Sequence, residues 1–161
     1  MLKKVFFAAV SLMLLVAGRC FAARTGNVPA TEGSLGGITL GCDMSYVESI
    51  YGNPSERYWT TDHVHEDAIA NRYGKGFYIL QSSYDMKVEE VYVNANNGIA
   101  TPAGVTVGVP KATVDSLYGN GSYWKGSYMY WTTAGKVIEI TYGRNSDGVT
   151  VVKSIRVRYQ G

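Results

Sequence analysis

The sequence of 161 residues holds 15 basic and 13 acidic side chains, for a formal net charge of +2, and 46% of its residues are hydrophobic. Three of the basic residues, Lys3, Lys4 and Arg19, lie at the N-terminus. Without residues 1–23, 12 basic residues face 13 acidic ones. This balance excludes the strongly basic surface by which proteins bind nucleic acids or anionic membranes.

Residues 1–23 have the layout of a secretory signal peptide. A charged start is followed by an apolar run from Val5 to Ala17 and by small residues at Ala22 and Ala23. The run of about 13 residues is shorter than the roughly 20 that a membrane-spanning helix needs. We therefore predict cleavage after Ala22 or Ala23, a periplasmic or secreted mature chain, and no transmembrane helix within it.

The two cysteines are Cys20 and Cys42. Cys20 lies where a lipoprotein would carry its lipid anchor, but Arg19 occupies the preceding position, where a small residue is needed. A lipid anchor at Cys20 is therefore disfavoured. Only Cys42 remains after cleavage, so the mature chain has to fold without an internal disulfide.

A segment of 17 residues occurs twice. Residues 37–53 align without gaps on residues 104–120, an offset of 67, and eight positions are identical. Each copy predicts a short extended start, a glycine turn, a short amphipathic helix and a glycine at the helix end. The match indicates an internal duplication. The residues of the repeated motif are Gly37, Gly41, Val47, Tyr51, Gly52, Gly104, Gly108, Val114, Tyr118 and Gly119.

Segments with strand-like alternation follow each helix. In the first half, a strand ends near Tyr73, and residues 77–84 and 89–93 form a hairpin. In the second half, the predicted strands are residues 128–132, 137–142 and 149–159. The last of these alternates Val151, Ile155, Val157 and Tyr159 with polar residues, as expected of a sheet that is buried on one face.

These elements predict an α+β fold, a tandem repeat of a helix followed by about three antiparallel strands, with the helices packed on one face of the sheet. Repeat units of this size are each marginal alone, so we expect them to share or abut one sheet. The predicted division is residues 1–23 signal peptide, 24–36 N-terminal segment, 37–93 first repeat unit, 94–103 linker and 104–161 second repeat unit.

The motif Gly-(Ile/Val)-Thr-(Leu/Val)-Gly, with Val six positions later and then Tyr-Gly-Asn, resembles a superfamily of exported tandem-repeat proteins. This superfamily includes the outer-membrane assembly lipoproteins of the BamE (SmpA/OmlA) type and the β-lactamase inhibitor proteins. The resemblance covers nearly all of residues 37–160. It implies repeats that begin with a helix and continue as antiparallel strands, and it implies a non-catalytic module that binds a partner.

Aromatic residues are the most suggestive candidates for a binding surface. The chain has 13 tyrosines and three tryptophans, all of them after the signal peptide. These side chains combine a large contact area with a polar group, as binding interfaces favour. The predicted binding residues are Tyr58, Trp59, Tyr123 and Trp124, which follow the helix in equivalent places of each copy, and Trp131.

Metal binding and catalysis are less well supported by the sequence. His63 and His65 lie in the polar stretch Asp62–Asp67 and, with a carboxylate, are suited to hold zinc or copper, but a solvated loop explains them better. Cys42 precedes a predicted helix and has Val109 as its counterpart, which favours a packing role over a nucleophilic one. We predict no catalytic residue, no metal and no cofactor.

The sequence therefore predicts a non-catalytic exported binding module that engages another protein of the cell envelope, and no nucleic acid. Two alternatives stay open. A glycan-binding or cell-wall-binding module would use the same aromatic residues as stacking platforms. A metal-binding protein or an enzyme would use His63 and His65.

Overall fold

The computed structural model of the chain describes residues 26–60 and 67–160. The predicted signal peptide of residues 1–23, its cleavage site and Cys20 lie outside the described residues. His63 and His65 lie outside them as well, in the gap between residues 60 and 67.

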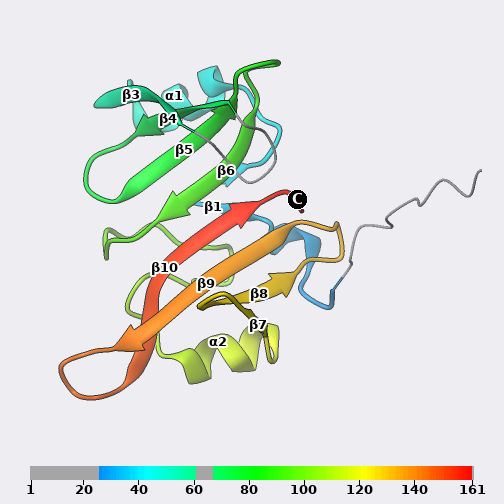
Figure 1. Cartoon of the computed structure of the whole chain (residues 1–161), viewed down its shortest axis with the longest axis vertical. Helices are drawn as coiled ribbons and strands as arrows, with labels where there is room; N and C mark the ends of the chain where they lie inside the picture. The colour runs from blue at the N-terminus through cyan, green and yellow to red at the C-terminus, as the bar shows by residue number, and fades with distance from the viewer. Residues whose placement is uncertain (1–25, 61–66, 161) are drawn as a thin grey trace, which may run out of the picture.

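Eight strands form one antiparallel sheet in the order β3-β4-β5-β6-β10-β9-β8-β7, which Figure 1 shows with β3 near the top and β7 near the bottom. A separate two-stranded sheet is formed by β1 and β2. In chain order the elements are η1 (Ala30–Glu32), β1 (Ser34–Leu35), β2 (Ile38–Thr39), α1 (Met44–Tyr51), β3 (Glu56–Thr60), β4 (Ala68–Arg72), β5 (Phe77–Ser82), β6 (Val88–Val93), α2 (Lys111–Tyr118), β7 (Ser122–Trp124), β8 (Ser127–Trp131), β9 (Val137–Arg144) and β10 (Thr150–Arg158).

The predicted fold class is wrong. The chain is a mostly antiparallel β protein built on a single eight-stranded sheet, with two short helices, and not an α+β tandem repeat of a helix and about three strands. The strands that the prediction lacked are β3 and β7, at the two edges of the sheet. Nearly all of β3 and all of β7 are exposed, so neither segment shows the alternation of apolar and polar residues by which a half-buried strand is recognised.

Both helices are where the repeated motif predicts them. Val47 of α1 and Val114 of α2 are fully buried and anchor the helices to the sheet. Asp43 precedes α1 at the N-cap position, but its carboxylate makes no capping hydrogen bond and lies 2.6 Å from Lys87 Nζ. Pro110 precedes α2 at the corresponding position. Neither described helix is long and apolar enough to cross a membrane.

Glycine ends each helix for a conformational reason. Gly52 has φ 72° and ψ −161°, and Gly119 has φ 74° and ψ −167°. This backbone region is open almost only to glycine. In that conformation the Gly52 amide donates to Glu48 O, and the Gly119 amide donates to Asp115 O, so a carbonyl of each last turn is satisfied. The chain then turns away from each helix toward an edge strand.

The hydrophobic core lies between the helices and one face of the sheet. Alternate residues of the inner strands point toward the helices, as the period of two requires. The sheet residues of this core include Phe77, Ile79, Val91, Val93, Ile138, Ile140, Ile155 and Val157, which cluster with Val47 and Val114. The other face of the sheet carries aromatic and charged residues.

Candidate binding surface

We call the face of the eight-stranded sheet that points away from the core and the two helices the open face. Residues paired in register across an antiparallel sheet point to the same side, so two rows can be followed across this face. The first row is Tyr58, Ala70, Leu80, Glu90, Arg158, Val137 and Trp131. The second row is Glu56, Arg72, Tyr78, Tyr92, Arg156, Glu139, Met129 and Ser122.

The first half of the open face has a groove of about 300 Å³ that we call the tyrosine groove. Tyr58, Tyr78 and Tyr92 line it, with Leu80 in the first row between them. The ring centroids of Tyr78 and Tyr92 are 6.0 Å apart. Three phenol rings from three different strands thus border one hollow on the sheet.

The second half of the open face has a groove of about 320 Å³ that we call the tryptophan groove. Trp124 of β7 and Trp131 of β8 line it together with Met129 and Arg158. Trp124 is 54% exposed, while Met129 beneath the groove is buried. The groove therefore combines accessible indole rings with an apolar floor.

Four charged residues separate the two grooves, and we call them the arginine–glutamate network. Arg156 Nε lies 2.9 Å from Glu90 Oε1 and Arg156 Nη1 lies 3.6 Å from Glu139 Oε1. Arg158 Nε lies 3.2 Å from Glu139 Oε2. Within this network the formal charges of the two arginines and the two glutamates balance.

The arginine–glutamate network lowers the pKa of Glu139. Burial alone would raise the pKa of this carboxyl, because a charged group loses hydration. The hydrogen bond with Ser127 and the positive charges of Arg156 and Arg158 outweigh burial and hold the pKa of Glu139 below its ordinary value. Glu139 is therefore ionised at neutral pH and fixes both arginines. The guanidinium of Arg156 also lies over the ring of Tyr92, 4.7 Å from its centroid.

The five predicted binding residues divide between the two edges of the sheet: Tyr123, Trp124 and Trp131 border the tryptophan groove, Tyr58 borders the tyrosine groove, and Trp59 borders neither. Tyr58 and Trp59 lie on β3 at one edge of the sheet, and Tyr123 and Trp124 lie on β7 at the opposite edge (Figure 1). Neighbouring residues of a strand point to opposite faces. Tyr58 and Trp124 therefore share the open face with Trp131, whereas Trp59 and Tyr123 point to the helix side. The ring of Tyr123 lies 5.3 Å from that of Tyr128 there.

Several residues of the open face could not be selected from the sequence. Tyr78 and Tyr92 are two among many tyrosines, and only the pairing of β5 with β6 places them side by side. Glu90 and Glu139 were given no role, because their arginine partners lie far away in the chain. The alternation of Arg156 and Arg158 with apolar residues in β10 was the signal that this face is polar, although Arg158 is buried.

Cys42 has the properties of a packed thiol. It is partly buried against the core, and burial raises the pKa of its thiol, which the backbone hydrogen bond at Thr39 offsets only in part. A raised pKa leaves little thiolate at neutral pH, and thiolate is the reactive form. Within the described ranges 26–60 and 67–160, no three histidine, cysteine, aspartate or glutamate residues are grouped so as to hold a metal ion.

Comparisons with known proteins give only weak similarity. No family model matches the chain, and no curated protein matches it. The crystal structure of a cysteine-rich secretory protein from Staphylococcus aureus subsp. aureus Mu50 is similar with a TM-score of 0.46 and 14% sequence identity. The match covers 87% of this chain and 51% of that chain, so this chain spans about half its length. Similarity at this level establishes neither a shared fold nor a shared function.

Proposed function

We propose that this chain is an exported, non-catalytic binding module of the cell envelope that holds a partner protein on its open face. The observation that carries the proposal is that the tyrosine groove and the tryptophan groove lie on the same face, while both helices pack on the other. A partner can therefore contact both grooves at once without displacing any element of the core.

The residue types of the open face support this proposal. Tyrosine, tryptophan and arginine are the side chains that most often dominate the binding energy of protein interfaces. Here Tyr92 and Arg156 stack on each other at the border of the tyrosine groove. Both are held by neighbouring strands, so little side-chain entropy remains to be lost when a partner docks.

The arginine–glutamate network also favours a protein partner of ordinary surface charge. The four charges balance within the network, so these residues do not require a partner of opposite net charge. Binding energy would come from covering the aromatic rings on either side. The location in the envelope is supported by the signal-peptide pattern of residues 1–23, and the resemblance of the repeated motif to exported partner-binding proteins is consistent with a non-catalytic role.

The proposal is tested by photo-crosslinking in cells that export the chain. A photoreactive amino acid is placed at Tyr92 in one groove and, in a second variant, at Trp131 in the other. The matched controls carry it at Tyr84, in the β5–β6 hairpin, and at Leu117, on α2, which are 94% and 46% exposed and lie outside both grooves. We expect the same protein to be captured from both groove positions and from neither control.

Purified material then tests the contribution of each groove. Tyr92→Ala and Trp131→Ala should each weaken binding of the captured protein by about tenfold or more, as expected of a central aromatic residue, whereas Tyr84→Ala should not. Equal capture from control and groove positions, or none from either groove, would contradict the proposal. Retention on purified peptidoglycan that Trp131→Ala abolishes would instead support the glycan-binding alternative.

A further inference from the structure

The outer edge of β3 is open within the described part of the chain, where only β4 pairs with this strand. Residues Glu56 to Trp59 are all exposed, and Trp59 is exposed by 70%. An exposed edge strand is a template for pairing with another strand. The opposite edge, β7, has only three residues, so β3 offers the longer ladder.

The direction of the free backbone groups follows from the register of the sheet. The Tyr73 amide donates to Phe77 O across the β4–β5 pair, whereas the Arg72 carbonyl points toward β3 and accepts from the amide of Ser55, the residue before that strand. Residues of an antiparallel strand alternate between the two neighbours in this way. Since Arg72 pairs with Glu56 and Ala70 with Tyr58, the N–H and C=O groups of Arg57 and Trp59 point outward.

We propose that two copies of this chain associate through β3, with the two strands antiparallel about a two-fold axis at Tyr58. In this register Arg57 pairs with Trp59 of the second copy, and Trp59 pairs with its Arg57. All four outward groups of each strand then find partners, since residues in such a pair exchange both N–H···O bonds. The two sheets become one continuous sheet.

In this register the side chains of β3 are complementary to those of β3 in the second copy. On the helix side, the guanidinium of Arg57 faces the indole of Trp59 from the second copy, a favourable cation–π pair that occurs twice. On the open face, Tyr58 faces Tyr58, and Glu56 faces Thr60. No like charges are opposed. A register centred on Arg57 would place two guanidinium groups against each other, and one centred on Glu56 would do the same with two carboxylates.

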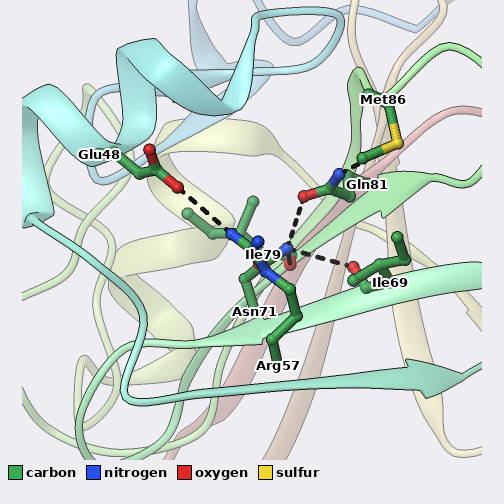
Figure 2. Close-up of polar contacts among 7 residues, drawn as sticks. All are labelled: Glu48, Arg57, Ile69, Asn71, Ile79, Gln81 and Met86. Carbon is green, nitrogen blue, oxygen red and sulfur yellow. Dashed lines mark hydrogen bonds and ion pairs between the residues drawn. The ribbon is translucent and has the colours of Figure 1, made fainter.

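Arg57 is already held in place for this contact. Its Nε donates to Asn71 Oδ1 at 2.7 Å, and its Nη2 lies 3.3 Å from Glu48 Oε1 on α1. Asn71 is buried and donates in turn to Gln81 Oε1 at 2.9 Å. Figure 2 shows Arg57 fixed between the helix and the sheet by this network. The side chain therefore loses little freedom on pairing, and it is still 51% exposed and accessible to an indole of the second copy.

The proposal is independent of the partner-binding role. Trp59, the residue it depends on most, points away from the open face, and the oligomeric state can be measured without any partner protein. If the two copies do pair, Tyr58 brings the tyrosine grooves of both copies to the shared axis.

A disulfide test reads out the register directly in a chain that begins at residue 24 and carries Cys42→Ser. Tyr58→Cys places two cysteines opposite each other at the axis, about 4.5 Å apart between Cα atoms, within the range of a disulfide. Glu56→Cys is the matched control on the same strand. Its two copies are displaced by four positions, roughly 13 Å, too far for a disulfide. We expect mild oxidation in a glutathione buffer to give covalent dimers of the first variant only.

Association without a disulfide is tested by light scattering during size-exclusion chromatography. The unsubstituted chain should show a mass that rises toward twice the monomer with concentration. Trp59→Lys places a lysine opposite Arg57 of the second copy and should lower the association constant about tenfold or more. Tyr84→Lys should leave it unchanged. A strictly monomeric unsubstituted chain, or cross-linking of Glu56→Cys as readily as of Tyr58→Cys, would overturn the proposal.

Discussion

The hydroxyl of Tyr118 donates a hydrogen bond of 2.6 Å to Glu32 Oε2, although the two residues are 86 positions apart. The same oxygen accepts from the Ala103 amide at 3.0 Å, and Thr101 Oγ1 lies 2.6 Å from the Tyr118 hydroxyl. Glu32 is buried. One carboxylate thus ties the last residue of α2 to η1 and to the segment before α2.

Tyr118→Phe should lower the free energy of unfolding by about 1–3 kcal/mol, because it removes a donor from a buried carboxylate that keeps its other partner. The aromatic contact with Tyr130, at 5.7 Å between centroids, survives the change. Urea unfolding measures the effect. Tyr84→Phe, at a residue exposed by 94%, is the control and should change stability by less than about 0.5 kcal/mol. Equal stability of both variants would contradict the assigned role of the hydrogen bond.

Tyr118, which is buried, and Tyr142, which is partly buried, make folding sensitive to alkali. Burial raises the pKa of Tyr118 above its ordinary value of 10, and the hydrogen bond to Glu32 adds to the rise. Burial likewise raises the pKa of Tyr142, and its hydrogen bond with Tyr130 adds to that rise. Above about pH 10 the unfolded chain loses protons that the folded chain keeps, so stability falls as pH rises.

This stabilisation is therefore fully present below about pH 10 and is lost above it. Urea unfolding between about pH 8 and pH 11 should show the decline, and Tyr118→Phe should make it less steep because one titrating group is gone. A slope that is the same in both proteins would show that Tyr118 does not keep its proton in the folded state.

Glu139 gives the opposite dependence in acid. Its pKa is held below the ordinary value of 4.5, so its contribution to stability is fully present above about pH 4.5 and is lost as pH falls through the folded value. Glu139→Gln should cost about 1–3 kcal/mol at neutral pH and should flatten the acid decline. The control is Glu48→Gln, which alters a more exposed ion pair with Arg57 and should cost about 1 kcal/mol or less. An unchanged acid decline in Glu139→Gln would refute this role.

The glycines that end the helices should be hard to replace. Gly52→Ala and Gly119→Ala should each cost about 1–3 kcal/mol of stability, because an L-residue is strained at this φ and ψ. No atom lies within 4 Å of the added Cβ at either position, so the cost comes from backbone conformation alone. Gly143→Ala in β9, where φ lies outside the left-handed range and the Cβ meets the flexible Lys153 side chain at 3.0 Å, should cost less. Thermal and urea unfolding of the three variants decide the point.

Much of the local structure could be predicted because it depends on neighbours in sequence. The helical spacing of Val47 with Tyr51, and of Val114 with Tyr118, places α1 and α2, and the alternation in residues 149–159 places β10. The edge strand β3 could not be found in this way. Tyr58 and Trp59 point to opposite faces of the sheet, and both are exposed. The segment therefore shows no alternation of buried and exposed residue types, and only its pairing with β4 defines the strand.

The candidate binding surface could likewise be predicted only in part. The aromatic content pointed to binding, and the sequence singled out Tyr58, Trp124 and Trp131, which do lie on the open face. Which aromatics share a face depends on register between strands far apart in the chain, so Tyr78 and Tyr92 were not chosen and Trp59 was grouped with Tyr58. The pairing of Arg156 with Glu90 and Glu139 depends on the same long-range register.

The place of β10 in the middle of the sheet sets the order in which the molecule can be completed. Ile155 pairs with Val93, 62 positions earlier, and the same strand pairs with β9 on its other side. Until β10 pairs with them, β6 and β9 each present an unpaired inner edge, and such edges promote aggregation. A chain that stops before residue 150 would therefore lack β10 and would expose two unpaired strand edges that favour aggregation. β10 therefore joins the two halves of the sheet, because it is the strand that pairs with both β6 and β9.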